Sequence, residues 1–338
     1  MKNINKIVFL SLLLIMGLSL FFLTGYASSE EIVIKLGHHH NVGGEFDVFA
    51  QKFKEVAEEK SKGQLRIDIY PGGQLGQEGE AAEGVLMGSL DMSIISEPMY
   101  SGMIEGFGIG NLPYLYKNRE ALLKSATNSP VGEELGKRIL EKGARILGCR
   151  CATPRHMIFT KKEVKNLEDL KGLKMRSPED RIYIDMFRKL GCSPTPITWG
   201  EAYLALQTGV VDGMETPLNT GVDMNFHEVA KYVFLDYHML GTNLLLINEK
   251  AFQKLPVELQ KIVLESGKIA EDFTNSIAEQ TEQKAIKVMK DYGLKFNEIS
   301  EEDLVKAKSL FAETHKEWAK ENNATELIEI IYEINKNI

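Results

Sequence analysis

The 338-residue chain has little cysteine. It contains Cys149, Cys151 and Cys192 and no CxxC pair. An odd number leaves at least one thiol unpaired, and two cysteines on the same face of one strand have poor geometry for a mutual disulfide. The composition therefore argues against a disulfide framework, and we expect all three cysteines to be small buried apolar side chains.

The common catalytic signatures are also missing. We find no nucleophile elbow, no HExxH, no Walker loop and no GxGxxG, and "GIGN" at 108–111 is too short for a dinucleotide fingerprint. The triplet His38–His40 alternates in direction on an extended chain, which favours a hydrogen-bonding histidine in a ligand cleft over a metal site. We predict no enzyme, no cofactor and no metal. An exported enzyme stays an alternative, because the carboxylates and histidines would permit an acid/base pair.

Long apolar runs are confined to the N-terminus. A basic start, "MKNINK", precedes "IVFLSLLLIMGLSLFFL" and then small residues at Gly25 and Ala27. This pattern predicts a secretory signal peptide over residues 1–27 and a periplasmic or other extracytoplasmic location. An uncleaved membrane anchor is the alternative, because the run approaches the length of a short spanning helix. Tyr26 stands where a lipidated cysteine would be, which excludes lipid anchoring at that site.

Basic residues are outnumbered by acidic ones. The formal net charge is -8, and removal of residues 1–27 takes away Lys2 and Lys6 and leaves -10. Such an excess argues against nucleic acid or an anionic membrane as a general partner. It does not exclude a small anion, which responds to local charge. The content of 43% hydrophobic and 26% charged residues is that of a globular protein long enough for two domains.

The hydrophobic pattern predicts an α/β protein. Strands are expected at 31–38, 64–73 and 91–96, separated by helices at 45–63 and 77–90, which implies a mostly parallel sheet. A second unit of alternating strands and helices spans 154–236, with strands at 156–160, 173–176, 193–196 and 210–213. A long helical pattern without proline follows from Pro256 to Tyr292, and a short strand and two helices end the chain.

Two arginines at strand ends suggest a site for an anion. Arg176 ends the predicted strand 173–176, and the following Ser177 and Pro178 predict a helix start, with its favourable dipole. Arg155 precedes the strand 156–160, so two planar guanidinium groups could hold one carboxylate. Independent surface arginines are the alternative. Trp199, at another predicted helix start, would stack on a ligand or pack in the core.

Several stretches taken together resemble the solute-binding proteins of tripartite ATP-independent periplasmic (TRAP) transporters, the dicarboxylate/sialic-acid-binding family. They are "IDIYPGGQLGQEGEAAEGVLMGSLDM", "NLPYLY", "NLEDLKGLKMRSPED", "LGCSPTPITWGEAYLALQTGVVDGMETPL" and "EVAKYV", and they are spread over residues 32–300. One such stretch would be weak evidence for the family, whereas all of them in this order are a specific match.

The resemblance implies the two-domain periplasmic-binding-protein fold, with a central cleft, hinge strands and a long helix spanning both domains. We expect domain I to comprise 32–152 and 241–280, and domain II to comprise 153–240 and 281–338. The arginine that ends "GLKMR", Arg176, would bind a ligand carboxylate, with help from Arg155. Trp199 would pack on the ligand, and Thr216 stands where sialic-acid binders have asparagine, which argues against sialic acid. The resemblance also suggests three further ligand-binding residues, His39, Glu97 and Tyr100.

The expected function is capture of a small organic acid, with closure of the domains and delivery to a small four-helix and a large multispanning membrane subunit, by a monomer. A sugar acid such as a uronate or aldonate is favoured, because Glu97 in the cleft would suit hydroxyls better than a second carboxylate. The alternatives are a C4-dicarboxylate or another carboxylate, and a ligand sensor that signals to a receptor.

Overall fold

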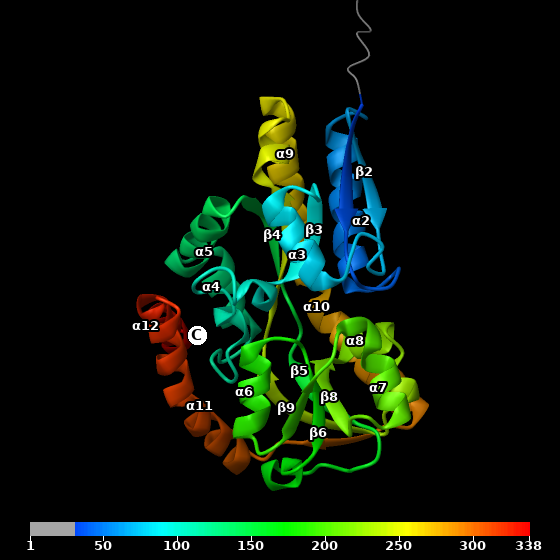
Figure 1. The fold of residues 1–338 in the computed structure, drawn as a ribbon, viewed down its shortest axis with the longest axis vertical. Helices are drawn as coiled ribbons and strands as arrows, with labels where there is room; N and C mark the ends of the chain where they lie inside the picture. The colour runs from blue at the N-terminus through cyan, green and yellow to red at the C-terminus, as the bar shows by residue number, and fades with distance from the viewer. Residues whose placement is uncertain (1–30) are drawn as a thin grey trace, which may run out of the picture. The chain divides into compact units, whose positions relative to one another are not determined.

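Two β-sheets organise the chain in the computed structural model, which describes residues 31–338 (Figure 1). Sheet A has the strand order β2 (Leu65–Tyr70), β1 (Ile32–Gly37), β3 (Met92–Ser96), β10 (Thr242–Asn248) and β4 (Ala144–Cys151). Sheet B has the order β11 (Lys295–Glu298), β9 (Tyr232–Met239), β5 (Arg155–Phe159), β8 (Gly213–Pro217), β6 (Lys174–Ser177) and β7 (Ser193–Pro196). The chain belongs to the α/β class.

Helices cover sheet A. They are α2 (Glu45–Lys60), α3 (Glu78–Met87), α4 (Arg119–Thr127), α5 (Pro130–Glu141) and α9 (Glu249–Gln253), with short 3-10 turns η1 (Glu97–Tyr100) and η2 (Ile109–Asn111) after β3. Helix α2 forms as its sequence predicts: Phe46, Phe49 and Phe53 recur at helical spacing and are fully buried. Strands β1 and β3 pair in parallel, whereas β10 runs antiparallel to both β3 and β4.

Sheet B carries shorter elements. They are η3 (Leu167–Leu170), α6 (Arg181–Lys189), η4 (Trp199–Glu201), α7 (Ala202–Thr208), α8 (Leu218–Asp223) and η5 (Phe226–Glu228). The 36-residue helix α10 (Val257–Tyr292) packs against α2 and β4 near sheet A and against α8 near sheet B. Helices α11 (Glu301–Glu321) and α12 (Thr325–Lys336) follow, and α12 packs on α4 and α5 (Figure 1).

The chain passes between the sheets by short links. One link joins β4 to β5, and a second joins β9 back to β10. The backbone N–H of Ala152 in the first link donates to the carbonyl of Gly241 in the second, at 2.8 Å. The two links therefore run side by side, and with α10 they connect the regions around the two sheets.

Most predicted elements are present, including the long helix and the two C-terminal helices. The strand predicted at 210–213 is present but lies further along the chain, as β8: α7 ends at Thr208, Gly209 follows it with φ of +75°, and the pairing with β5 begins only at Gly213. Strand β9, which the sequence analysis did not predict, comes later in the chain, after η5. The predicted signal peptide lies outside the described residues.

The helix start predicted at Pro178 is also wrong. Strand β6 continues through Ser177, whose carbonyl accepts from the N–H of Ile197 at 3.1 Å. Helix α6 begins at Arg181, and Asp180 is its N-cap, accepting from the N–H of Ile182 at 2.8 Å. An acidic side chain therefore already occupies the positive end of this helix dipole.

Candidate functional site

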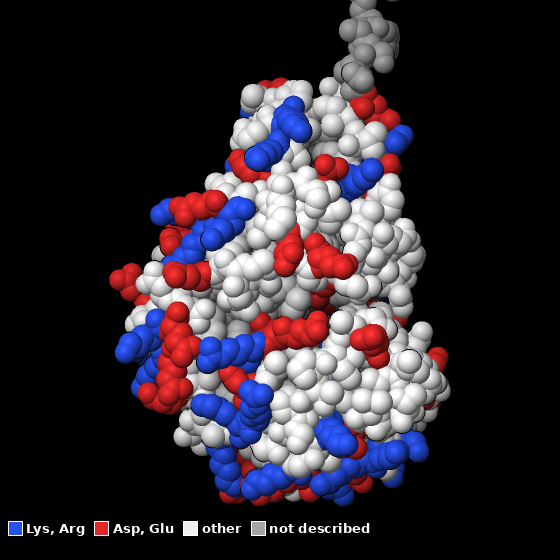
Figure 2. Space-filling view, in the orientation of Figure 1, with Lys and Arg blue, Asp and Glu red and all other residues white. Residues whose placement is uncertain are grey.

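A cavity of about 460 Å³ lies between the carboxyl ends of the sheet A strands β1 and β3 and the ends of β6, β7 and β8 in sheet B. Its wall combines the loop after β1, the start of α3, the turns after β3, the start of α6 and η4. In open α/β folds, ligands bind at such strand ends. Figure 2 shows acidic side chains over α3 and in the region between α3 and α6.

Arg176 is the penultimate residue of β6, one residue before the strand end, and lies on the cavity wall with 2% exposure. Its Nε donates to the carbonyl of Ile197 at 2.9 Å, but its Nη1 has no hydrogen-bond partner among the described residues. The guanidinium carbon lies 5.4 Å from the centroid of the Trp199 ring. Burial lowers the pKa of Arg176 to about 10. A buried cation with an unused donor favours binding of an anion.

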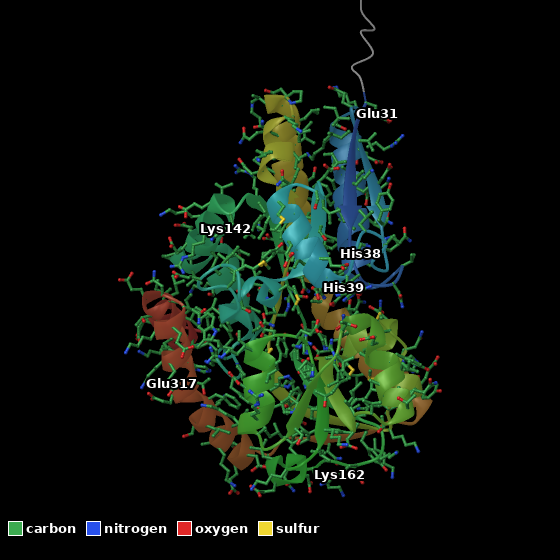
Figure 3. All side chains as sticks on the ribbon, in the orientation of Figure 1. Glu31, His38, His39, Lys142, Lys162 and Glu317 are labelled. Carbon is green, nitrogen blue, oxygen red and sulfur yellow. The ribbon has the colours of Figure 1, made fainter. Side chains whose placement is uncertain are left out.

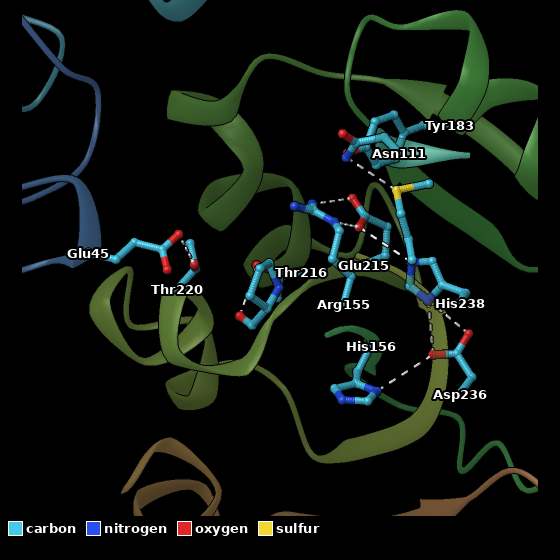
Figure 4. A network of polar contacts seen from close by, with 12 residues as sticks. Glu45, Asn111, Arg155, His156, Tyr183, Glu215, Thr216, Thr220, Asp236 and His238 are labelled. Carbon is cyan, nitrogen blue, oxygen red and sulfur yellow. Dashed lines mark hydrogen bonds and ion pairs between the residues drawn. The ribbon is translucent and has the colours of Figure 1, made fainter. Parts of the chain in front are cut away.

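Arg155, on the same wall, is already paired. Its guanidinium contacts both carboxylate oxygens of Glu215 on β8, with Nη2 to Oε1 at 2.8 Å. Glu215 also lies 3.5 Å from His238 Nε2, and His238 Nδ1 contacts Asp236 at 2.9 Å (Figure 4). Arg155 is thus the end of a chain of buried charges that runs under the cavity.

This buried chain shifts the pKa of its members in opposite directions. Burial alone would raise the pKa of Glu215, but Arg155 and then His238 lower it to about 2. Burial alone would lower the pKa of His238, but Asp236 and then Glu215 raise it to about 9. At neutral pH, His238 is therefore a cation and Glu215 an anion.

An aromatic wall faces Arg176. Trp199 stacks on His40 with ring centroids 5.8 Å apart, and His40 stacks on Phe46 at 3.9 Å. His38 and His39 follow β1 near the start of α3, and His39 Nε2 lies 3.5 Å from Glu78, the first residue of that helix (Figure 3). Burial lowers the pKa of both His39 and His40, so this wall adds no positive charge at neutral pH.

The structure separates the predicted site residues into two groups. On the cavity wall lie Arg176, Arg155, Trp199 and His39. Outside the residues that line it are Thr216, Glu97 and Tyr100. Glu97 is 2% exposed and accepts from the N–H of Gly108 and from the hydroxyl of Thr242, while the Tyr100 hydroxyl donates to the carbonyl of Ala82.

Polar contacts cross the cavity from one sheet to the other. Asp180, the N-cap of α6, accepts from the hydroxyl of Ser101, which follows η1. On another side, Glu45 at the start of α2 accepts from Asn219 Nδ2 at 2.5 Å and from Thr220 Oγ1 at 3.0 Å. These contacts hold the two walls together in the conformation described.

The sequence analysis did not single out several residues of the cavity wall, among them Glu45, Asn111 and Tyr183. Asn111 opens "NLPYLY", one of the stretches that carried the resemblance, and this was a signal that could have drawn attention to it. Tyr183 lies in the helix predicted after Arg176, but helical spacing alone does not tell a cavity side chain from a core side chain.

Within residues 31–338, no group of three or more His, Cys, Asp or Glu side chains is arranged to hold a metal ion. None of the helices in this part of the chain is both long and apolar enough to cross a membrane. All three cysteines are buried and free, as the sequence predicts.

Several known proteins are similar to this chain in sequence and in fold. A solute-binding protein of Roseobacter denitrificans is 30% identical over 252 residues, covering 74% of this chain and 77% of its own length. The C4-dicarboxylate-binding periplasmic protein DctP of Rhodobacter capsulatus is 29% identical, covering 87% and 88%. The 2,3-diketo-L-gulonate-binding periplasmic protein YiaO of Escherichia coli is 27% identical, covering 83% and 85%.

A solved structure extends the likeness to three dimensions. A TRAP periplasmic solute-binding protein of Sulfitobacter sp. NAS-14.1, with bound β-D-galacturonate, matches with a TM-score of 0.84 and 25% identity, covering 91% of this chain and 100% of that chain. The profile of the bacterial extracellular solute-binding proteins, family 7 (DctP), matches residues 37–322. The chain therefore belongs to family 7 of the bacterial extracellular solute-binding proteins, the DctP family of TRAP transporter solute-binding proteins.

Proposed function

We propose that this protein captures a small sugar acid in the cavity, with Arg176 binding the ligand carboxylate, and delivers it to TRAP membrane subunits. The observation that carries the proposal is the Nη1 atom of Arg176, which is buried on the cavity wall without a partner among the described residues. A carboxylate would supply both the missing acceptor and the missing counter-charge.

The charges around the cavity favour one carboxylate over two. Arg155 also lies on the wall, with a side chain that is 15% exposed, and Glu215 already neutralises it. Glu78, which also lines the cavity, would repel a second carboxylate but accept hydrogen bonds from hydroxyl groups, whereas Glu45 is already paired with Arg150. A C4-dicarboxylate, the ligand named for the relative in Rhodobacter capsulatus, is therefore the second candidate.

The apolar side of the cavity suits a sugar acid. Trp199 and the stacked His40 present flat rings, which pack well on the C–H face of a sugar or of an extended polyol. Related proteins support this class: the Sulfitobacter protein holds galacturonate, and a second protein from that organism, 26% identical, holds α-D-taluronate.

Closure of the cavity would couple binding to delivery. The contacts of Ser101 with Asp180 and of Glu45 with Asn219 bridge the two walls, and ligand bound between them would favour the bridged state. The proposal includes the division into domain I (32–152, 241–280) and domain II (153–240, 281–338). It also includes a monomeric state, a cleaved signal peptide and the absence of enzymatic activity.

The test is ligand-induced stabilisation of the purified chain starting at Ser28, with uronates, aldonates, dicarboxylates and 2-oxo acids. A ligand at about one hundred times its dissociation constant stabilises by about 2.7 kcal/mol, which raises the melting temperature by several degrees. We expect a shift with a sugar acid, its loss in Arg176→Ala and its partial return in Arg176→Lys. Arg188→Ala, an exposed arginine on α6, is the matched control and keeps the shift.

Two outcomes would contradict the proposal. Equal affinity of wild type and Arg176→Ala for a sugar acid would show that Arg176 does not bind the ligand. A ligand recovered from the protein as a chemically altered product, detected by NMR of the incubated mixture, would favour an enzyme. Delivery is tested separately, by ligand uptake into proteoliposomes that contain the membrane subunits; uptake independent of this protein would favour the receptor-sensor alternative.

A further inference from the structure

Asn111 and Tyr183 meet across the binding cavity. Asn111 ends η2, which follows β3 of sheet A, and Tyr183 lies on α6, which follows β6 of sheet B. Asn111 Nδ2 donates to the Tyr183 hydroxyl at 2.8 Å, and both side chains lie on the cavity wall, each 2% exposed (Figure 4). The same amide nitrogen lies 3.5 Å from Met239 Sδ, so the nitrogen side of this amide is fully engaged.

The pair leaves one acceptor and one donor unused. Asn111 Oδ1 is buried and has no hydrogen-bond partner among residues 31–338. The Tyr183 oxygen accepts from Asn111, so its own O–H proton is available to donate. An amide oxygen can only accept, and a buried acceptor without a donor is costly, so the bound ligand is expected to bring an O–H or N–H to this point.

Tyr183 also stands beside Arg155, whose guanidinium carbon lies 5.3 Å from the Tyr183 ring centroid. Arg176 lies on the wall of the same cavity as Asn111 and Tyr183. A carboxylate bound by Arg176 therefore shares the cavity with the Tyr183 hydroxyl and with the Asn111 amide oxygen.

We infer that Asn111 and Tyr183 select 2-hydroxy acids: the Tyr183 O–H donates to a carboxylate oxygen, and Asn111 Oδ1 accepts from the hydroxyl on carbon 2. This inference rests on the proposed function and sharpens its substrate class. An open-chain aldonate carries that hydroxyl. A cyclic uronate has the ring oxygen at the corresponding carbon, and a 2-oxo acid has a carbonyl, so both would place an acceptor against an acceptor.

The test is isothermal titration calorimetry with matched acids. The chain starting at Ser28 is titrated with D-gluconate and D-galactonate, each beside its 2-oxo acid and its cyclic uronate. We expect an aldonate to bind about tenfold to a hundredfold more tightly than its two counterparts, because each counterpart leaves the amide oxygen without a donor.

Variants assign the preference to these side chains. Asn111→Leu is expected to weaken aldonate binding and to bring the three acid types close to equal affinity. Tyr183→Phe is expected to weaken the binding of all three acid types by a similar factor, because the Tyr183 hydroxyl donates to the carboxylate that they share. Asn337→Leu, exposed on the last turn of the chain, is the control and keeps the preference. Thermal unfolding without ligand checks that each variant is folded.

The outcomes of these experiments distinguish failure of this inference from failure of the proposed function on which it rests. Tight binding of a 2-oxo acid or uronate in preference to aldonates, with loss in Arg176→Ala, would overturn the 2-hydroxy selection and leave the carboxylate site intact. An aldonate preference that survives in Asn111→Leu would overturn the role of the amide. Failure of every acid to bind, or binding that ignores Arg176→Ala, would overturn the proposed function and the inference with it.

Discussion

The buried pair of His238 and Glu215 predicts an unusual loss of stability in alkali. In the folded chain the pKa of His238 is about 9, against a reference value of 6.5. A group whose pKa is raised by folding stabilises the fold while it is protonated in both states. The contribution is therefore complete below about pH 6.5 and is lost as the pH rises through about 9.

The magnitude follows from the same two values. The difference between 6.5 and about 9 corresponds to about 3 kcal/mol of unfolding free energy. The pKa of Glu215 is lowered to about 2 first by Arg155 and then by His238, and its contribution is lost only as the pH falls from about 4.5 through 2, so it does not change between pH 6.5 and 9. His39 and His40 have pKa values lowered by burial, and their effect falls below pH 6.5, outside this window.

The assay is guanidinium chloride unfolding of the ligand-free chain at several pH values between 6.5 and 9. We expect the free energy of unfolding to fall by about 3 kcal/mol across this range in the wild type. His238→Gln should be less stable at pH 6.5 and nearly independent of pH above it. His227→Gln, outside the buried chain, is the control and should keep the wild-type slope. A flat wild-type profile, or an equal slope in His238→Gln, would refute the reasoning.

Three further predictions concern stability without ligand. Arg176→Met should raise the melting temperature, measured by calorimetry, since it removes a buried charge that has no ion-pair partner in the described part of the chain; a lower melting temperature would contradict this. Glu45→Ala should cost about 3–5 kcal/mol in denaturant unfolding, because Arg150, 2.7 Å from Glu45, would be left buried and unpaired. Gly213→Ala should lower expression and melting temperature, because a Cβ there would lie 2.5 Å from the Ile158 carbonyl oxygen; wild-type stability would count against this close approach.

The ion pair between Arg155 and Glu215 affects ligand binding as well as stability. Arg155 lies on the cavity wall, but its guanidinium pairs with Glu215 in the conformation described. A ligand carboxylate could draw Arg155 towards itself only by weakening that pair. Within residues 31–338, Arg176 has no such competitor, since its guanidinium donates only from Nε, to the Ile197 carbonyl. This difference is why one arginine rather than two carries the proposed carboxylate site.

The sequence by itself determined the α/β class, nearly all helices and the position of Arg176 at the end of a strand. These features depend on residues close together in the chain, such as the phenylalanines of α2 at helical spacing and the glycine that ends α7. Family membership was also readable, because ordered stretches such as "GLKMR" and "VVDGMETP" do not require knowledge of the fold.

Only the tertiary structure decided what each polar side chain meets. The pairing of Arg155 with Glu215 depends on the register of β5 against β8, which are 60 residues apart in the chain. Glu97 follows a strand end as predicted, yet its carboxylate turns to Gly108 and Thr242 instead of the cavity. Asn111 and Tyr183 come from opposite sheets, so no local pattern could join them. Local sequence sets backbone geometry, but the partners of a buried charge or amide are set by long-range packing.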